Sequence, residues 1–354
     1  MVRSAHHDNG LLFCHDWDVL RIAINGYGRI GRIVHRQLVE RFGKDVAVVG
    51  INASSDAAMR QYLLKYDTLH GRFGGSVEVD GEHLRVNGSP VRVVRERDPA
   101  KCPWKELKAD VVIEATGKFR SADLCKPHLT AGARAVLMTA PPKDETTMIV
   151  RGVNDDALKG ALPVVSAASC TTNCIAPILK VLDEAIGVER GLVCTTHAYT
   201  TSQNLLDNST DSSKVRIARA AALSIIPSTT GAVKACAKIF PHLKGKVDGM
   251  AFRVPVPDVS AAYLALTMKG RTTVDEVHAA LEAASKGSLK GILAVEKDLL
   301  VSADYLTDPH SSTIDMDSTA VIDGTLVQLV SWYDNEWGYA MRVSEMAVNI
   351  GRFL

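Results

Sequence analysis

The sequence predicts an α/β fold in which a doubly wound, mostly parallel sheet is followed by an α+β domain with a mostly antiparallel sheet. Two observations predict it. Up to about residue 169, short apolar runs alternate with segments of helical periodicity, as in repeated strand–helix–strand units. Beyond that point, residues 192–200 and 250–268 alternate apolar and polar positions over longer stretches, as broad antiparallel strands do. A chain of 354 residues has room for two domains of ordinary size.

The composition excludes several classes of protein. Hydrophobic residues make up 46% and charged residues 23%, which supplies a sizeable core and argues against global disorder. The 41 lysines and arginines nearly balance the 40 acidic residues, so bulk charge does not attract nucleic acid or a membrane surface. No apolar run approaches the roughly 20 residues of a spanning helix. We therefore expect no nucleic-acid partner and no membrane partner.

The expected location is the cytoplasm. The first twenty residues carry Asp8, Asp16 and Asp18 and have no long apolar centre, unlike a secretory signal. The seven cysteines are odd in number and scattered, which favours a reducing compartment over a disulfide framework. Residues 1–18 are interpreted as a polar N-terminal extension.

The first strand–helix–strand unit is predicted over residues 19–52. Residues 19–25 form an apolar, β-rich run, and apolar side chains then recur at helical spacing from Ile30 to Leu38. Gly43 suits the end of this helix, and residues 46–52 are a second buried strand. The unit has about the 30 residues of a right-handed parallel crossover.

The other elements follow in order. The segment from Asp56 to Lys65 has a helical pattern, and the turn signals Asp80-Gly81 and Asn87-Gly88 predict hairpins within residues 76–95. Residues 111–117 and 135–141 are short apolar strands. We expect helices near residues 274–285 and after Asn335.

A glycine pattern lies between the first strand and the first helix. Residues 25–32 read NGYGRIGR, so Gly26, Gly28 and Gly31 form G-x-G-x-x-G. In this setting the first glycine makes the tight turn, the second lets a pyrophosphate approach, and the third lets helix and strand pack closely. The free N–H groups and the dipole of the helix start favour that anion. A merely structural turn is the alternative, but the position predicts a Rossmann-type dinucleotide site.

The second strand ends without the acid that normally holds the ribose diol. It continues as Asn52-Ala53-Ser54-Ser55, and we expect Asp56 to cap the next helix. A carboxylate at position 53 would repel a 2′-phosphate, whereas Ala53 and Ser54 leave room and a hydroxyl donor. We expect NAD or NADP as the cofactor, with a slight preference for NADP; drift at this position with NAD still bound is the alternative.

Cys170 is the candidate nucleophile. It lies in SAASCTTNC, between an apolar strand and a helical pattern, where a helix dipole stabilises a thiolate. Because Pro177 lacks an N–H, the helix begins either at Cys170 or nearer Ala176. By spacing alone, Cys170 is equally a nucleophile and a small buried hydrophobic residue. Cys174 follows one turn later, but no second cysteine pair completes a metal site, so no metal is expected.

His197 ends an apolar alternation and is therefore expected at a strand end. A lone histidine is more often structural than catalytic, and sequence separation does not pair it with Cys170. Four other residues offer groups suited to anions but are also ordinary on strands and surfaces: Thr200, Thr230, Gly231 and Arg253.

From about residue 20 to its end, the chain resembles the phosphorylating glyceraldehyde-3-phosphate dehydrogenase family. The motifs that carry the resemblance are long and occur in order: AINGYGRIGR, LLKYDTLHGRF, EATGKF, SAASCTTNC, HAYT, SIIPSTTGA, GMAFRVPVP and WYDNEWGY. The resemblance implies an NAD(P)-binding Rossmann domain at residues 19–169 and 335–354, and a catalytic domain at residues 170–334. Residues 198–226 look like the family's loop between subunits, which implies a homotetramer.

The resemblance also implies a reaction, the reversible phosphorylating oxidation of D-glyceraldehyde 3-phosphate to 1,3-bisphosphoglycerate. Cys170 would form the thioester and His197 would accept the proton as hydride moves to NAD(P). Inorganic phosphate would be bound by Ser169, Thr171, Thr230 and Gly231, and the substrate phosphate by Thr200, Arg216 and Arg253. The implied cofactor residues are Gly26, Gly28, Arg29, Ile30, Gly31, Ala53, Ser54, Arg97, Thr116, Thr139 and Asn335.

The chain departs from the family pattern at two places. Members restricted to NAD carry Asn-Asp where this chain has Asn52-Ala53, and Asn-Ala-Ser resembles members that use NADP in the gluconeogenic direction. The segment between Gln203 and Lys214 is unusual, which weakens the assignment of Arg216 relative to that of Arg253.

Two alternative functions fit parts of the same pattern. An erythrose-4-phosphate dehydrogenase has the same site but hydrolyses its thioester with water; Thr230 and Gly231 favour phosphate as the acceptor. The other is a nucleotide-binding interaction protein with secondary catalysis, against which the presence of both Cys170 and His197 argues.

Overall fold

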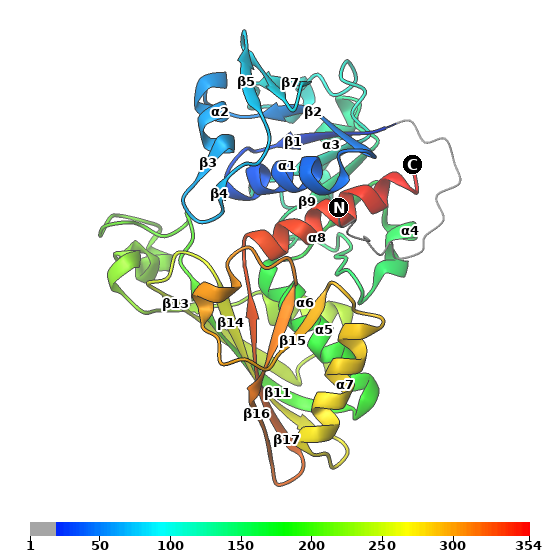
Figure 1. The fold of residues 1–354 in the computed structure, drawn as a ribbon, viewed down its shortest axis with the longest axis vertical. Coiled ribbons are helices and arrows are strands. Elements are labelled where there is room, and N and C mark those ends of the chain that lie inside the picture. The colour runs from blue at the N-terminus through cyan, green and yellow to red at the C-terminus, as the bar shows by residue number, and fades with distance from the viewer. Residues whose placement is uncertain (1–18) are drawn as a thin grey trace, which may run out of the picture.

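Two β-sheets organise the chain, one in each half of Figure 1. The computed structural model describes residues 19–354, so the proposed extension at residues 1–18 lies outside the described residues. The upper half of the figure combines the N-terminal segments with the last helix, and the lower half contains the segments between them. The α/β class that the sequence predicts is therefore confirmed.

The first sheet has eight strands within the described residues, in the order β10-β9-β8-β1-β2-β7-β6-β5. From β10 to β7 the strands run parallel, and β6 and β5 add an antiparallel edge. Their bounds are β1 Leu20–Asn25, β2 Val46–Asn52, β5 Val77–Asp80, β6 His83–Val86, β7 Ser89–Val94, β8 Val111–Glu114, β9 Ala135–Met138 and β10 Val164–Ser166. The small pair β3 (Tyr66–Asp67) and β4 (Gly71–Arg72) stands apart.

Helices cover this sheet and include the C-terminal one. They are α1 (Arg29–Phe42), α2 (Ala57–Lys65), α3 (Ala122–Thr130), α4 (Leu158–Ala161) and α8 (Trp337–Gly351). Helix α8 lies along α1 (Figure 1), and the Gln37 side chain donates to the Trp337 carbonyl oxygen at 2.9 Å. Ile22 and Ile24 of β1 and Val343 and Met346 of α8 are fully buried in one core, which ties the end of the chain to its first strand.

The second sheet is mixed. Its seven strands within the described residues follow the order β12-β13-β11-β14-β17-β16-β15, with parallel pairing only between β13 and β11 and between β16 and β15. Their bounds are β11 Val188–Ala198, β12 Ile226–Thr229, β13 Val247–Val254, β14 Ser260–Met268, β15 Leu293–Glu296, β16 Ser312–Ile322 and β17 Leu326–Tyr333. The sheet is mostly antiparallel, as expected.

One detail of the predicted second sheet is wrong. Residues 250–268 were expected as one long alternation, but they belong to two strands, β13 and β14, with a break at residues 255–259. Pro255 and Pro257 lie in the break, and a proline cannot donate a hydrogen bond to a neighbouring strand. The chain therefore turns there, and β13 and β14 lie on opposite sides of β11.

Helices cover one face of the second sheet, and the other face is exposed. The covering helices are α5 (Cys170–Ala185), α6 (Ala232–Ile239) and α7 (Val274–Lys286), and they share a buried core with β11, β14 and β17. Leu192, Met250 and Tyr263 alternate with buried neighbours on these strands and remain exposed. An apolar face of this kind is typical of a protein–protein contact.

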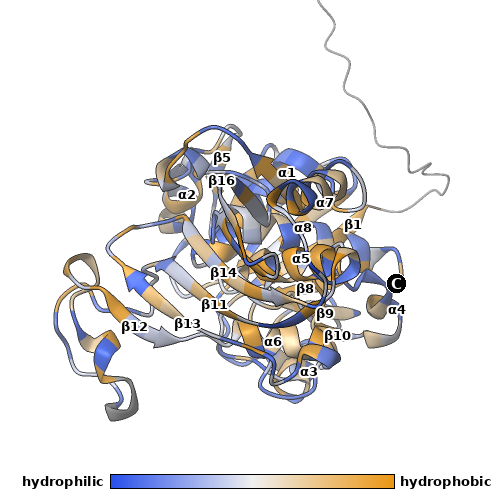
Figure 2. Cartoon of the chain, turned by 90° about the horizontal axis from the view of Figure 1, so that it is seen from below, coloured by the Kyte–Doolittle hydropathy of each residue, from blue (hydrophilic) through white to orange (hydrophobic). Residues whose placement is uncertain are grey.

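The segment between β11 and β12 projects from the body in both ribbon views (Figures 1 and 2). It contains the short 3-10 helices η3 (Ser212–Ala218) and η4 (Ala221–Leu223). The other 3-10 helices of the described residues are η1 Pro99–Lys101, η2 Asp155–Ala157, η5 Pro241–Leu243 and η6 Ser302–Tyr305. Within residues 19–354, no helix combines the length and apolar character needed to cross a membrane.

Candidate active site

The glycine turn connects β1 to the start of α1. Gly26 has φ +95°, and a Cβ there would lie 2.6 Å from the Thr116 backbone nitrogen. A Cβ at Gly31 would lie 2.2 Å from the Gly26 carbonyl oxygen, so only glycine fits where the helix crosses the turn. No side chain caps α1 and its first turn carries no acid. Its first N–H groups, at Arg29 and Ile30, are therefore available to an anion.

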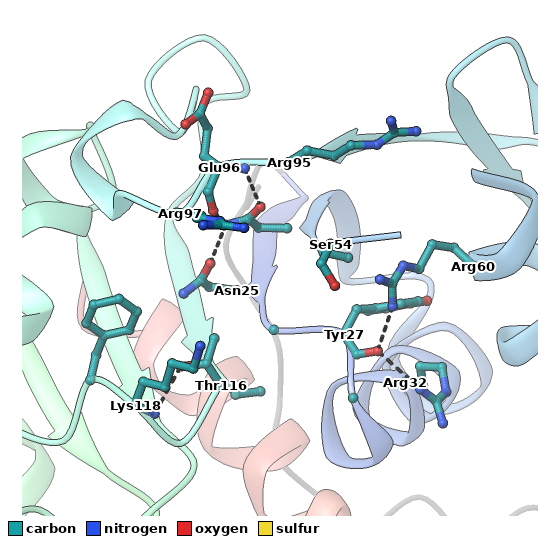
Figure 3. A pocket seen from close by; sticks show the side chains of 16 residues that line it. Asn25, Tyr27, Arg32, Ser54, Arg60, Arg95, Glu96, Arg97, Thr116 and Lys118 are labelled. Atoms are coloured by element: carbon teal, nitrogen blue, oxygen red, sulfur yellow. Dashed lines mark hydrogen bonds between the residues drawn. The ribbon is translucent and has the colours of Figure 1, made fainter. Parts of the chain in front are cut away.

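A cavity of about 900 Å³ opens beside this turn (Figure 3). Six of the predicted cofactor residues line it: Gly26, Gly28, Ala53, Ser54, Arg97 and Thr116. Sequence reasoning did not assign the other ten to the site: Asn25, Tyr27, Arg32, Asn52, Arg60, Arg95, Glu96, Ala115, Lys118 and Phe119. Many of these follow strands β1, β2, β7 and β8, so the rule that ligands bind at the carboxyl ends of parallel strands would have found them.

The remaining predicted cofactor residues do not line the cavity. The Arg29 side chain turns away and donates to Asp67 and Glu336, which leaves only its backbone N–H at the helix start. Thr139 follows β9, and its hydroxyl donates to the Glu114 carbonyl oxygen at 3.2 Å. Asn335 is buried before α8, and its side-chain oxygen accepts a hydrogen bond from the Ser260 hydroxyl at 2.6 Å.

A buried polar network that the sequence did not predict supports the cavity floor. The Glu114 carboxylate accepts from the backbone N–H of Thr116 at 2.8 Å and from the side chain of Asn25. Trp104 donates to Nδ1 of His128 at 2.9 Å, so the other ring nitrogen of His128 is left to donate to Glu114, 3.2 Å away. These hydrogen bonds hold the cavity residues Asn25 and Thr116 in fixed positions.

The helix of the candidate nucleophile begins at Cys170, and the alternative start near Ala176 is wrong. Ser169 is the N-cap and its hydroxyl accepts the Thr172 backbone N–H at 3.1 Å. Pro177 is accommodated inside the helix. Ala168, just before the cap, has φ +56°, a left-handed conformation that is costly for a residue with a Cβ. Tyr339 and Ser166 hold Ala168 there by hydrogen bonds of 3.1 and 3.0 Å.

The fold brings His197 to Cys170. His197 lies at the end of β11, and its Nε2 is 3.5 Å from Cys170 Sγ. His197 is buried and Cys170 is half-buried at the same place. This separation is within the range of a sulfur hydrogen bond, so a proton can pass between the two side chains.

Arg253 lies on the other side of the His197 ring. The two residues are register partners on β13 and β11, and Arg253 Nη1 is 2.7 Å from His197 Nδ1. Burial lowers the pKa of His197 to about 3, and the Arg253 cation acts in the same direction. Burial raises the pKa of the Cys170 thiol above its usual range, while Arg253 and the Thr171 hydroxyl oppose that rise. Both shifts favour the neutral forms of the two side chains.

The other predicted substrate residues lie in different surroundings. Thr171 is buried with its hydroxyl 3.0 Å from the Tyr333 hydroxyl, and Thr200 follows β11 with its hydroxyl 2.9 Å from that of Ser202. Thr230 accepts the Ala232 N–H at 3.2 Å, and Gly231 is the exposed N-cap of α6. Arg216 is exposed on the projecting segment, and within residues 19–354 no hydrogen bond or ion pair joins it to Cys170, His197 or Arg253.

Comparisons with known proteins agree with this geometry. Residues 20–122 match the glyceraldehyde 3-phosphate dehydrogenase NAD binding domain, and residues 169–335 match the glyceraldehyde 3-phosphate dehydrogenase C-terminal domain. The first match contains the glycine turn and the second contains Cys170, His197 and Arg253.

Individual relatives are similar over nearly the whole chain. Glyceraldehyde-3-phosphate dehydrogenase 2 of Bacillus subtilis is 47% identical over 92% of this chain and 95% of its own length. Glyceraldehyde-3-phosphate dehydrogenase of Geobacillus stearothermophilus is 49% identical over 94% of this chain and 98% of its own length. Glyceraldehyde-3-phosphate dehydrogenase A of Escherichia coli is 45% identical over 94% of this chain and 99% of its own length. The chain belongs to the glyceraldehyde 3-phosphate dehydrogenase family.

Proposed function

We propose that the protein is an NAD(P)-dependent oxidoreductase that catalyses the reversible phosphorylating oxidation of D-glyceraldehyde 3-phosphate to 1,3-bisphosphoglycerate. The observation that carries the proposal is the 3.5 Å approach of His197 Nε2 to Cys170 Sγ at the start of α5. Membership of the family and the cavity at the glycine turn support it. The substrate class and the cofactor class both follow from this combination.

Cys170 and His197 divide the first half of the reaction. The Cys170 sulfur bonds to the aldehyde carbon, and the thiol proton passes through His197 to the carbonyl oxygen, so that a hemithioacetal with a hydroxyl group forms on the protein. His197 takes the hydroxyl proton while hydride leaves the same carbon, and a thioester on Cys170 remains. The nicotinamide of NAD(P) supplies the hydride acceptor. Burial lowers the pKa of His197, so the ring is unprotonated before the hydroxyl proton arrives.

Inorganic phosphate completes the reaction. One phosphate oxygen attacks the thioester carbon, and the carbon–sulfur bond breaks. The acyl phosphate is released, and Cys170 is restored as a thiolate or thiol. We assign this phosphate to Ser169, Thr171, Thr230 and Gly231, and the substrate phosphate to Arg253, Thr200 and Arg216. The 2.7 Å position of Arg253 beside His197 supports its role, because an anion bound there is also next to the reacting carbon.

The cofactor is assigned to the cavity and its edges. The uncapped N–H groups of Arg29 and Ile30 suit a pyrophosphate, and Gly26, Gly28 and Gly31 let it approach. Ala53, Ser54, Arg97, Thr116 and Thr139 complete the adenosine side, and Asn335 holds the nicotinamide carboxamide. We further propose a preference for NADP over NAD, because no carboxylate follows β2 at position 53 to repel a 2′-phosphate.

The proposed organisation of residues 19–354 has two domains. Residues 19–169 with 335–354 form the cofactor domain, and residues 170–334 form the catalytic domain. A homotetramer would cover the exposed apolar face of the second sheet and the projecting segment, where Leu205, Leu206, Leu223 and Ile225 are between 68% and 84% exposed. The six cysteines that the structure describes are all free, which suits the cytoplasm.

The test is a pair of cysteine variants assayed with the aldehyde, phosphate and either cofactor. Cys170→Ser should abolish formation of the reduced cofactor. Cys174→Ser is the matched control, because Cys174 lies one turn later and is buried beside Ser331. Mass spectrometry of the quenched wild-type reaction should find the acyl group on the peptide with Cys170. Activity in Cys170→Ser, or an acyl group on another cysteine, would refute the proposal.

A further inference from the structure

Basic side chains are concentrated in the cavity beside the glycine turn. Of the sixteen described residues that line it, five are basic and one, Glu96, is acidic; the basic ones are Arg32, Arg60, Arg95, Arg97 and Lys118. The two phosphates of a pyrophosphate carry two negative charges, and the N–H groups of α1 already serve that anion. The excess of basic side chains therefore favours a ligand with more negative charge than a pyrophosphate alone.

Two of these arginines converge on one backbone atom. Arg60 Nη1 and Arg32 Nη1 each donate to the Tyr27 carbonyl oxygen at 3.2 Å, so the two nitrogens lie at most twice that distance apart (Figure 3). Arg60 comes from α2, seven residues after Ala53, and Arg32 comes from the first turn of α1. The pair thus joins the glycine turn to the corner that follows β2.

Neither guanidinium has a carboxylate partner among the described residues. The Nε atoms of both are buried without a hydrogen-bond partner, and the Arg60 residue is 7% exposed. Arg29, by contrast, has Asp67 and Glu336 within ion-pair distance. Burial lowers the pKa of Arg60, and the neighbouring Arg32 adds to that effect. Two unpaired cations held this close are stabilised when an anion binds between them.

We infer that Arg60 and Arg32 form a clamp for the 2′-phosphate of NADP. The corner after β2 is where this type of fold binds the ribose 2′ position, and an arginine there accommodates the phosphate. Ser54 lines the same corner and adds a hydroxyl. A phosphate presents oxygens to two guanidinium groups at once, which a hydroxyl does not. The inference rests on the cofactor preference proposed above and names the residues that would produce it.

The experiment measures affinity on the full chain, without turnover. NADP, NAD, 2′,5′-ADP and 5′-AMP are titrated by calorimetry into the wild type and into Arg60→Met, Arg60→Lys and Arg95→Met. Arg95 is the matched control, since it lines the same cavity and is exposed. We expect Arg60→Met to weaken the binding of NADP and 2′,5′-ADP about 10- to 100-fold, as for a lost charge-assisted hydrogen bond, and the binding of NAD much less. Arg60→Lys should retain part of the preference for NADP over NAD, and Arg95→Met should retain most of that preference.

Three results would overturn the clamp. Equal losses of affinity for NAD and NADP in Arg60→Met would mean that Arg60 only supports the glycine turn through the Tyr27 carbonyl oxygen. An equal loss of discrimination in Arg95→Met would mean that general charge is responsible. A wild type that binds 2′,5′-ADP no better than 5′-AMP would refute both the clamp and the NADP preference. None of these measurements depends on Cys170 chemistry, so a protein that shows the discrimination but oxidises no aldehyde refutes only the proposed reaction.

Discussion

The Arg253 guanidinium lies 2.7 Å from Nδ1 of His197, across the imidazole ring from the Cys170 sulfur. Arg253 can only donate a hydrogen bond, whereas the Ala198 carbonyl oxygen, also 2.7 Å from Nδ1, can only accept one. The two contacts require opposite tautomers of the ring. An anion that engages Arg253 therefore favours the tautomer in which Nδ1 donates to Ala198 and Nε2 is free to accept a proton.

The first prediction concerns the pH dependence of Cys170 alkylation. Because burial raises the pKa of this thiol, the thiolate population of the free protein should increase about tenfold per pH unit through neutral pH and up to pH 9. Arg253→Met removes a cation that favours the thiolate, so its profile should move to higher pH. Iodoacetamide labelling, followed by mass spectrometry between pH 6 and 10, measures both. A plateau below pH 8 in the wild type would instead indicate a stable thiolate–imidazolium pair.

The second prediction concerns the base. His197→Asn should slow hydride transfer by about 10²- to 10⁴-fold, because the proton of the hemithioacetal hydroxyl loses its acceptor. Cofactor affinity should be retained. Rapid-mixing measurement of the first turnover isolates the step. If the first turnover is as fast as in the wild type, His197 is not the base.

A third prediction follows from Ser260. Its hydroxyl donates to Asn335 and accepts the Ala198 backbone N–H at 3.1 Å, so it connects the proposed nicotinamide residue to the strand end of His197. Ser260→Ala should weaken NAD(P) binding about tenfold, since one buried hydrogen bond contributes about 1.5 kcal/mol. Ser228→Ala, which changes a half-buried hydroxyl elsewhere on the sheet, serves as control. Equal cofactor affinity in the two variants would contradict the role of Asn335.

A fourth prediction concerns the buried carboxyl of Asp258. Neither of its side-chain oxygens has a hydrogen-bond partner among the described residues, although Nε2 of the buried His70 lies 3.4 Å from Oδ2. Burial and the neighbouring Asp334 and Glu336 raise the pKa of Asp258 to about 9. The folded pKa lies above the unfolded value of about 3.9, so the stability from this group is complete below pH 4 and is lost as pH rises toward 9. Asp258→Asn removes that loss.

The Asp258→Asn variant should therefore melt a few degrees above the wild type at pH 8, with a smaller gap at pH 5, as about 1 kcal/mol moves the midpoint of a chain of this length by roughly 1–2 °C. Asp334→Asn is the contrasting variant. Asp334 accepts the backbone N–H groups of Thr307, Glu336 and Trp337 at 2.6–2.9 Å, so its loss should destabilise the protein at both pH values. A lower midpoint for Asp258→Asn at pH 8 would show that the carboxylate is needed.

The fifth prediction concerns position 53. Ala53→Asp places a carboxylate at the end of β2, where it repels a 2′-phosphate and accepts from a ribose hydroxyl. The ratio of kcat/KM for NAD to that for NADP should rise at least about tenfold, equivalent to 1.4 kcal/mol. Ala53→Ser controls for size. An unchanged ratio in steady-state assays with both cofactors would contradict the proposed basis of cofactor choice.

Local chemistry explains what could be predicted from the sequence. The spacing of Gly26 and Gly31 predicts a turn that only glycine can form, and a Cβ at Gly31 would lie 2.2 Å from the Gly26 carbonyl oxygen. Thr273 and Glu276 cap α7 reciprocally, and Asp56 caps α2, because these side chains satisfy backbone groups within three residues. Ser169 does the same for the helix of Cys170. In each case the interacting groups are neighbours along the chain.

The sequence by itself determined the doubly wound first half and the glycine turn, because each depends on periodicity or on groups a few residues apart. The tertiary structure alone decided that His197 meets Cys170, that Arg253 lies behind His197, and that Arg60 and Arg32 converge on Tyr27. Those contacts depend on the register between β11 and β13 and on the packing of α1 and α2 around the glycine turn. Strand register and helix packing are set by the fit of whole surfaces, which no short stretch of sequence contains.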